Sequence, residues 1–266
     1  MKQSPVNSGK RKSRPAGRIL RLTAALLLIV LLPCCAGAEE HFALRARGCG
    51  PLKYLTGDVQ IIVAFVSTPQ HPWTEKKKNE VFRVSNSSVR IMNQQARRYK
   101  ADLNLSYCYM EFSIPVECDS ERNWYNYILK NVFYRDSMPQ VLDYYNQDRK
   151  RSSTPIIFMF NSWDRSYAMV SSTDYPGWNE EYCVIFCDTK MHDNYLTHEV
   201  LHLYGAIDLY DYNGEGVERV AKKYFRNSDM LTVSHNVDDL TAYLVGWTDS
   251  LSSKARKFLA ETEGMR

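Results

Sequence analysis

The sequence predicts one α+β domain in which helices pack on a twisted, mixed β-sheet. Two apolar runs, residues 59–66 and 155–160, have the composition of buried strands, and residues 182–186 are predicted to form another short strand. Segments with helical periodicity lie between them, and no internal repeat or linker divides the chain. Strands and helices that alternate in this way favour a single layered domain.

Residues 1–38 are predicted to be an export signal that is not part of the fold. A long basic stretch precedes a short apolar run at residues 22–32, and Ala36-Gly37-Ala38 has the small-x-small pattern of a signal-peptidase site. We therefore expect cleavage and a secreted protein. A lipid-anchored or cell-surface form is less favoured, because a proline precedes Cys34 where a lipidation signal has a small residue.

The positive charge of the chain belongs to this leader. The full sequence has a formal net charge of +4, but residues 1–38 hold seven basic and no acidic residues, so the rest carries −3. No basic motif is left that would indicate nucleic acid as a partner. No uninterrupted apolar stretch of about 18 residues occurs, so we expect no stable membrane insertion after signal cleavage.

The elements of the domain can be predicted in order. Residues 39–56 are polar and irregular, and residues 57–266 are expected to form the folded domain. After the first strand, Thr74 is placed to cap a long amphipathic helix that ends near Tyr99. The remaining predicted elements are a strand at 103–114, two helical pieces within 121–149 separated near Pro139, the strand at 155–160, an edge strand at 167–171, a turn at 174–177, the strand at 182–186, a helix at 193–204 and a last helical region at 238–260.

The segment from Thr197 to Asp208 carries the clearest chemical signal. His198 and His202 are four residues apart on the predicted helix, so both imidazoles project from one face and can share a metal ion. Glu199 is rotated away from that ion and can reach a water molecule bound to it. Gly205 allows the chain to leave the helix in a left-handed conformation, which lets Asp208 return toward the histidines. Two imidazoles and a carboxylate form a ligand set for one Zn(2+) ion with an open fourth position.

This segment resembles the active-site helix of the metzincin metallopeptidases, whose motif HExxHxxGxx is followed by a third ligand. The aspartate at the last position is similar to that of snapalysin, a small bacterial neutral protease. The resemblance implies a zincin-like fold, His198, His202 and Asp208 as zinc ligands, and Glu199 as the catalytic glutamate. It also implies a methionine turn under the metal, with a counterpart at Ser228-Asp229-Met230-Leu231.

Several alternatives remain open in the sequence. Asp211 lies close to Asp208 and competes with it as the third ligand, and Cys49 is a candidate for a cysteine switch that blocks the metal. Cys183 and Cys187 have the spacing of two thiolate ligands that His192 would join. They are not expected to form a disulfide, because four residues of strand span about 13 Å.

The function that fits these residues is secreted zinc-dependent endopeptidase activity on a protein or peptide substrate. Zinc lowers the pKa of a bound water toward about 7, and Glu199 would act as the general base. One alternative is a secreted binding protein that keeps the zincin fold without turnover, which would need the ligands but no base. Another is a zinc amidase acting on cell-wall peptides. Substrate specificity and oligomeric state do not follow from the sequence.

Overall fold

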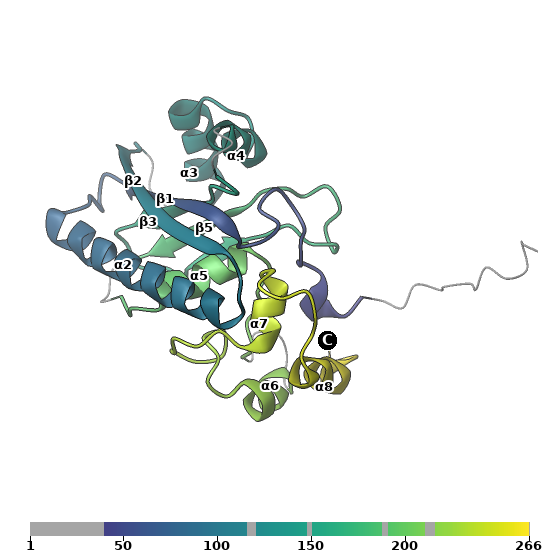
Figure 1. Cartoon of the computed structure of the whole chain (residues 1–266). Helices are drawn as coiled ribbons and strands as arrows, with labels where there is room; N and C mark the ends of the chain where they lie inside the picture. The colour runs from purple at the N-terminus through teal and green to yellow at the C-terminus, as the bar shows by residue number, and fades with distance from the viewer. Residues whose placement is uncertain (1–39, 116–120, 148–150, 188–190, 211–215, 266) are drawn as a thin grey trace, which may run out of the picture. The chain divides into compact units, whose positions relative to one another are not determined.

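A five-stranded sheet forms the centre of the computed structural model, which describes residues 40–115, 121–147, 151–187, 191–210 and 216–265 (Figure 1). Its strands are β1 (Gly57–Ser67), β2 (Leu103–Ser113), β3 (Ile156–Phe160), β4 (Tyr167–Met169) and β5 (Tyr182–Phe186), in the order β2-β1-β3-β5-β4. All neighbouring pairs are parallel except β4 and β5, which are antiparallel. The predicted mixed sheet is therefore confirmed, and the predicted edge strand lies at the edge.

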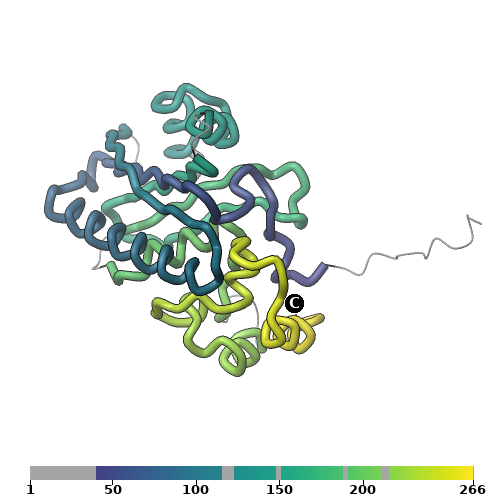
Figure 2. Tube along the Cα trace, in the orientation of Figure 1, coloured from purple at the N-terminus to yellow at the C-terminus, as the bar shows by residue number. Residues whose placement is uncertain are grey.

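The helices cover both faces of the sheet. They are η1 (Phe42–Leu44), α2 (Glu75–Arg98), α3 (Glu121–Ile128), η2 (Leu129–Phe133), α4 (Met138–Asn146), α5 (Tyr195–Leu203), α6 (Val217–Phe225), α7 (Asp239–Leu244) and α8 (Ser253–Thr262). On one face Phe65 of β1 packs against Phe82 of α2, and on the other Trp124 of α3 packs against Phe158 and Phe160 of β3. The Cα trace shows α2 and α5 on the same side of the sheet (Figure 2).

The central strands are continuously apolar because both of their faces are buried. Every residue of β3 and of β5 is buried, as are the residues of β1 from Ile61 onward. The cap predicted for the long helix is also confirmed, since the Thr74 side chain accepts a hydrogen bond from the Lys77 N–H. The core that positions α5 is thus made of the apolar runs that are visible in the sequence.

The prediction of one last helical region at 238–260 was wrong, because the chain forms two separate helices there. Gly246 has a φ of 83° after α7, and the Trp247 N–H donates to the Ala242 carbonyl, which is a Schellman-type helix end. A new helix, α8, then begins with Ser252 as its cap. Helix α6 was not predicted at all.

Residues 41–55 are more ordered than the polar composition suggested. They include the short helix η1, and Phe42, Ala43, Leu52 and Leu55 are buried in the core. The Leu55 N–H donates to the Val245 carbonyl, which ties the segment to the residues after α7. Residues His41–Arg266 form one compact unit, and the predicted leader lies outside the described residues.

Within the described residues, no helix combines the length and the apolar character that a membrane span requires.

Candidate metal centre

Helix α5 presents its two histidines from a firmly held position. Thr197, directly before His198, is fully buried, and its hydroxyl lies 3.0 Å from the Ser88 hydroxyl of α2. Tyr107 of β2 donates a hydrogen bond to the same Ser88 oxygen at 3.0 Å. These polar contacts lie within an apolar interface, so they fix the rotation of α5 about its axis as well as its position.

The chain leaves α5 as the sequence predicted. Gly205 has a φ of 90°, the left-handed region that favours glycine, and the Ala206 N–H donates to the Leu201 carbonyl at 3.1 Å. A Cβ at Gly205 would lie 2.9 Å from the Ala46 carbonyl oxygen, so the N-terminal segment also packs against this turn. The turn directs Asp208 back along the helix.

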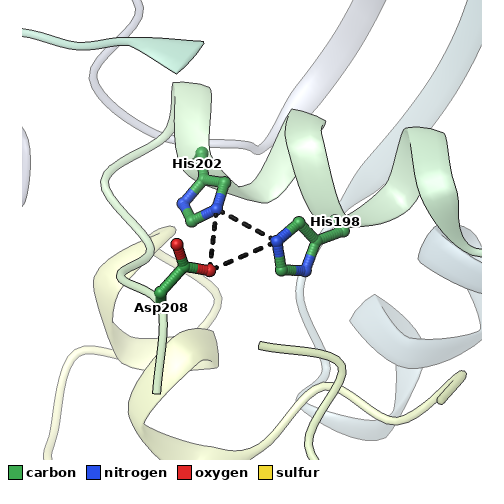
Figure 3. A group of neighbouring side chains, drawn as sticks. All are labelled: His198, His202 and Asp208. Carbon is green, nitrogen blue, oxygen red and sulfur yellow. Dashed lines mark hydrogen bonds and ion pairs between the residues drawn. The ribbon is translucent and has the colours of Figure 1, made fainter. Parts of the chain in front are cut away.

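His198, His202 and Asp208 come together as a compact triangle of ligand atoms (Figure 3). The two Nε2 atoms are 3.2 Å apart, and Asp208 Oδ1 lies 3.3 Å from His198 Nε2 and 3.2 Å from His202 Nε2. Donors bonded at 2.0–2.1 Å to a tetrahedral metal ion are separated by about 3.3–3.4 Å. The donor set therefore fits one metal ion in both chemistry and spacing.

The outer nitrogen of each imidazole is fixed by a backbone carbonyl. His198 Nδ1 lies 3.1 Å from the Asp229 oxygen, and His202 Nδ1 lies 2.9 Å from the Ala206 oxygen. Since a carbonyl oxygen only accepts, each Nδ1 must carry the proton, and in a neutral imidazole Nε2 then has a free lone pair. Both lone pairs point into the triangle, where a cation would accept them.

The electrostatics of the triangle also favour a positive charge at its centre. Burial lowers the pKa of His198, but the Asp208 and Glu199 carboxylates outweigh this and raise it to about 9. Burial likewise works against ionisation of Asp208, yet hydrogen bonding from the two imidazoles holds the pKa of Asp208 well below its usual range. The protein thus stabilises a cation shared between these side chains, whether proton or metal.

The turn at Ser228–Leu231 lies against the same site. Its Asp229 carbonyl is the one that accepts from His198 Nδ1. Its Met230 carbonyl accepts from the Leu209 N–H at 2.8 Å, which fixes the residue that follows Asp208. Met230 itself is fully buried. The Asp229 carboxylate accepts from Asn194 Nδ2 at 2.6 Å, and Asn194 also lines a cavity of about 530 Å³ together with Arg83, His192 and His235.

Glu199 lies beside the triangle and is not one of its members. Its side chain is 7% exposed, and burial raises the pKa of its carboxyl group. Oε2 accepts a hydrogen bond from the Cys183 thiol at 3.8 Å, a contact that the sequence gave no reason to expect. A buried carboxylate next to a cation site has the position and the affinity for protons that a general base requires.

The other candidate residues do not join this site. The Cys49 thiol donates to the Arg45 carbonyl at 3.3 Å and is not in the ligand group, so the structure does not place a cysteine switch on the triangle. Neither Cys183 nor Cys187 forms a disulfide, and among the described residues they form no metal group with His192. Asp211 lies outside the described residues.

Comparisons with known proteins give a distant structural likeness. No protein-family model matches the chain, and no curated protein matches it. Among solved structures, metalloproteinase-II from Bacteroides fragilis is similar over 74% of this chain, with 15% sequence identity and a TM-score of 0.41. The chain spans 58% of that protein's length.

Proposed function

We propose that this protein is a secreted zinc-dependent endopeptidase. The observation that carries the proposal is the triangle of His198, His202 and Asp208, whose ligand atoms lie 3.2–3.3 Å apart with both imidazole Nε2 lone pairs facing inward. Two imidazoles and one carboxylate are a zinc ligand set that leaves a position open for water or substrate. When bound there, zinc supplies Lewis-acid activation of a water molecule and of the scissile carbonyl.

Glu199 is the residue that makes this an enzyme and not only a metal site. Its carboxylate would take a proton from the attacking water and deliver that proton to the amine of the cleaved peptide bond. The raised pKa that burial gives the carboxyl group suits both halves of this transfer. A zincin-fold protein that only binds partners would need the three ligands but no buried carboxylate beside them.

Strand β4 offers a way to hold an extended peptide. It is the edge strand of the sheet, antiparallel to β5, and it contacts α5. A substrate that adds to β4 by backbone hydrogen bonds would run past the helix that carries the histidines. This mode binds any extended chain, which favours an endopeptidase over an amidase that selects cell-wall peptides.

The test combines metal content with peptide cleavage. We expect the zinc-loaded protein to cleave casein or a peptide library, to lose activity with a chelator and to regain it with zinc. Glu199→Gln should keep the metal and lower kcat by about 10²–10⁴-fold, the usual contribution of a general base. Glu263→Gln, a change in an exposed carboxylate, serves as the matched control.

Two outcomes would redirect the proposal. A folded, zinc-loaded protein that cleaves no member of a peptide library would indicate the non-catalytic binding protein. Cleavage restricted to amide bonds of cell-wall peptides would indicate the amidase. Secretion is tested separately by N-terminal sequencing of the exported protein, for which we expect a mature chain that begins at residue 39.

A further inference from the structure

We propose that Cys183 is a positioning residue for Glu199, an inference that rests on the endopeptidase function proposed above. The Cys183 thiol donates a hydrogen bond to Glu199 Oε2 at 3.8 Å. Cys183 is 0% exposed and Glu199 is 7% exposed, so water competes little for this contact. The thiol does not touch the reacting atoms; it acts on the orientation of the carboxylate that does.

The backbone around Cys183 is held on both sides. In β5, Cys183 is paired with Ile157 of β3 in a parallel ladder and with Ala168 of β4 in an antiparallel ladder. Its side chain points to the face covered by α5, whereas the neighbouring Tyr182 ring contacts Trp124 on the opposite face. The sheet therefore fixes the position of the sulfur, and the thiol can orient the Glu199 side chain of α5.

Glu199 needs such a fixed point because its side chain rotates about several bonds. Among the described residues, the Cys183 thiol supplies the one hydrogen bond that the Glu199 carboxylate accepts. This contact engages Oε2, and Oε1 accepts no hydrogen bond from the described residues, so Oε1 is available to take the proton of the attacking water. A general base works only when this oxygen lies within hydrogen-bond reach of that proton.

A thiol is suited to this task by its weakness as a donor. An S–H group donates a weaker hydrogen bond than a hydroxyl or an amide, so it can orient a carboxylate and still leave the carboxylate able to bind the attacking water. The neighbouring cysteine differs in its surroundings, since the Cys187 sulfur lies 3.6 Å from the Met191 sulfur. Cys187 is therefore a matched control: a buried thiol on the same chain segment, directed at a thioether.

The first measurement is independent of catalysis and of the metal. Infrared spectroscopy of the purified protein detects the S–H stretching bands, which lie in a window free of other protein absorption. Glu199→Ala removes the acceptor, so we expect one S–H band to move to higher frequency, and that band to be missing from Cys183→Ser. If Cys183→Ser does not fold, the shift in Glu199→Ala still tests the contact. S–H bands identical in wild type and Glu199→Ala would overturn the inference.

The second measurement separates positioning from general structural support. We expect Cys183→Ala to lower kcat about tenfold, part of the 10²–10⁴-fold that a general base contributes, with KM and zinc content unchanged. Cys183→Ser restores a donor and should retain kcat within about threefold, and Cys187→Ala should behave as wild type. A Cys183→Ala variant with wild-type kcat overturns this inference alone, whereas a wild-type protein that cleaves no peptide overturns the endopeptidase proposal as well.

Discussion

The buried carboxyl group of Glu181 makes the stability of the fold depend on pH. Glu181 directly precedes β5, is 2% exposed, and accepts a hydrogen bond from the Leu52 N–H at 2.8 Å through Oε2. Oε1 lies so close to Gly50 that a Cβ at that glycine would be 1.7 Å from it. Residues 50–52 of the N-terminal segment thus enclose the carboxyl group.

The sign and size of the effect follow from the pKa of this group. Burial raises the pKa of Glu181 from 4.5 to about 7, and the hydrogen bond from Leu52 offsets only part of that rise. The folded protein therefore binds a proton that the unfolded chain releases between pH 4.5 and 7, so the stability that Glu181 contributes is fully present below pH 4.5 and is lost as the pH rises to about 7. At about 1.4 kcal/mol for each tenfold change in the ionisation constant, the loss amounts to roughly 3 kcal/mol.

Glu181→Gln tests this reasoning, because the amide keeps an acceptor for Leu52 and cannot ionise. We expect its free energy of unfolding, measured by urea titration at pH 5 and pH 8, to decrease less with pH than that of wild type. The difference between the two proteins should be roughly 2–3 kcal/mol. The exposed Glu263→Gln variant is the control and should follow wild type. Equal pH dependence in Glu181→Gln and wild type would refute the argument.

Two further predictions concern the metal centre. Gly205→Ala should lower the free energy of unfolding by about 2 kcal/mol or more, because alanine is strained at a φ of 90° and its Cβ would lie 2.9 Å from the Ala46 oxygen. Gly177 has a φ of 86° with open space around it, so Gly177→Ala measures the backbone strain alone. If thermal unfolding shows the same loss of stability for Gly177→Ala and Gly205→Ala, the Ala46 contact does not contribute. Zinc at 100 times its dissociation constant should stabilise wild type by about 2.7 kcal/mol, and Asp208→Ala should lose most of this in differential scanning calorimetry. An undiminished zinc effect in Asp208→Ala would exclude that residue as a ligand.

Local signals were enough to predict most of the elements around the site. β3 and β5 are continuous apolar runs in the sequence and are fully buried in the fold. The geometry of the candidate site follows from spacing in the same way, since a separation of four residues places His198 and His202 on one helix face, and Gly205 permits the return of Asp208. These patterns depend on neighbours within about ten residues, which is the range that a sequence expresses directly.

Contacts between distant segments could not be predicted in this way. Phe42, Leu52 and Leu55 are buried, but they follow neither helical nor strand periodicity, so the sequence predicted only a polar, irregular segment there. Helix α6 is only nine residues long and begins after Gly216 without a side-chain cap, which left no start signal. The contact between Cys183 and Glu199 arises from the packing of α5 on β5, and no spacing rule connects a strand residue to a helix residue sixteen positions later.

The N-terminal segment has a consequence for how the site is supported. Its Ala46 carbonyl packs on Gly205, the residue that redirects the chain toward Asp208, and its Leu52 N–H binds Glu181, two residues before the thiol that contacts Glu199. The position of Asp208 and the orientation of Glu199 thus both depend on residues 41–55, which begin a few residues after the predicted signal cleavage site. If cleavage occurs there, the new chain end must leave this segment free to pack. The geometry of the centre would then depend on the packing of residues 41–55 against Gly205 and Glu181, so a change in this segment should affect the site as well as the fold.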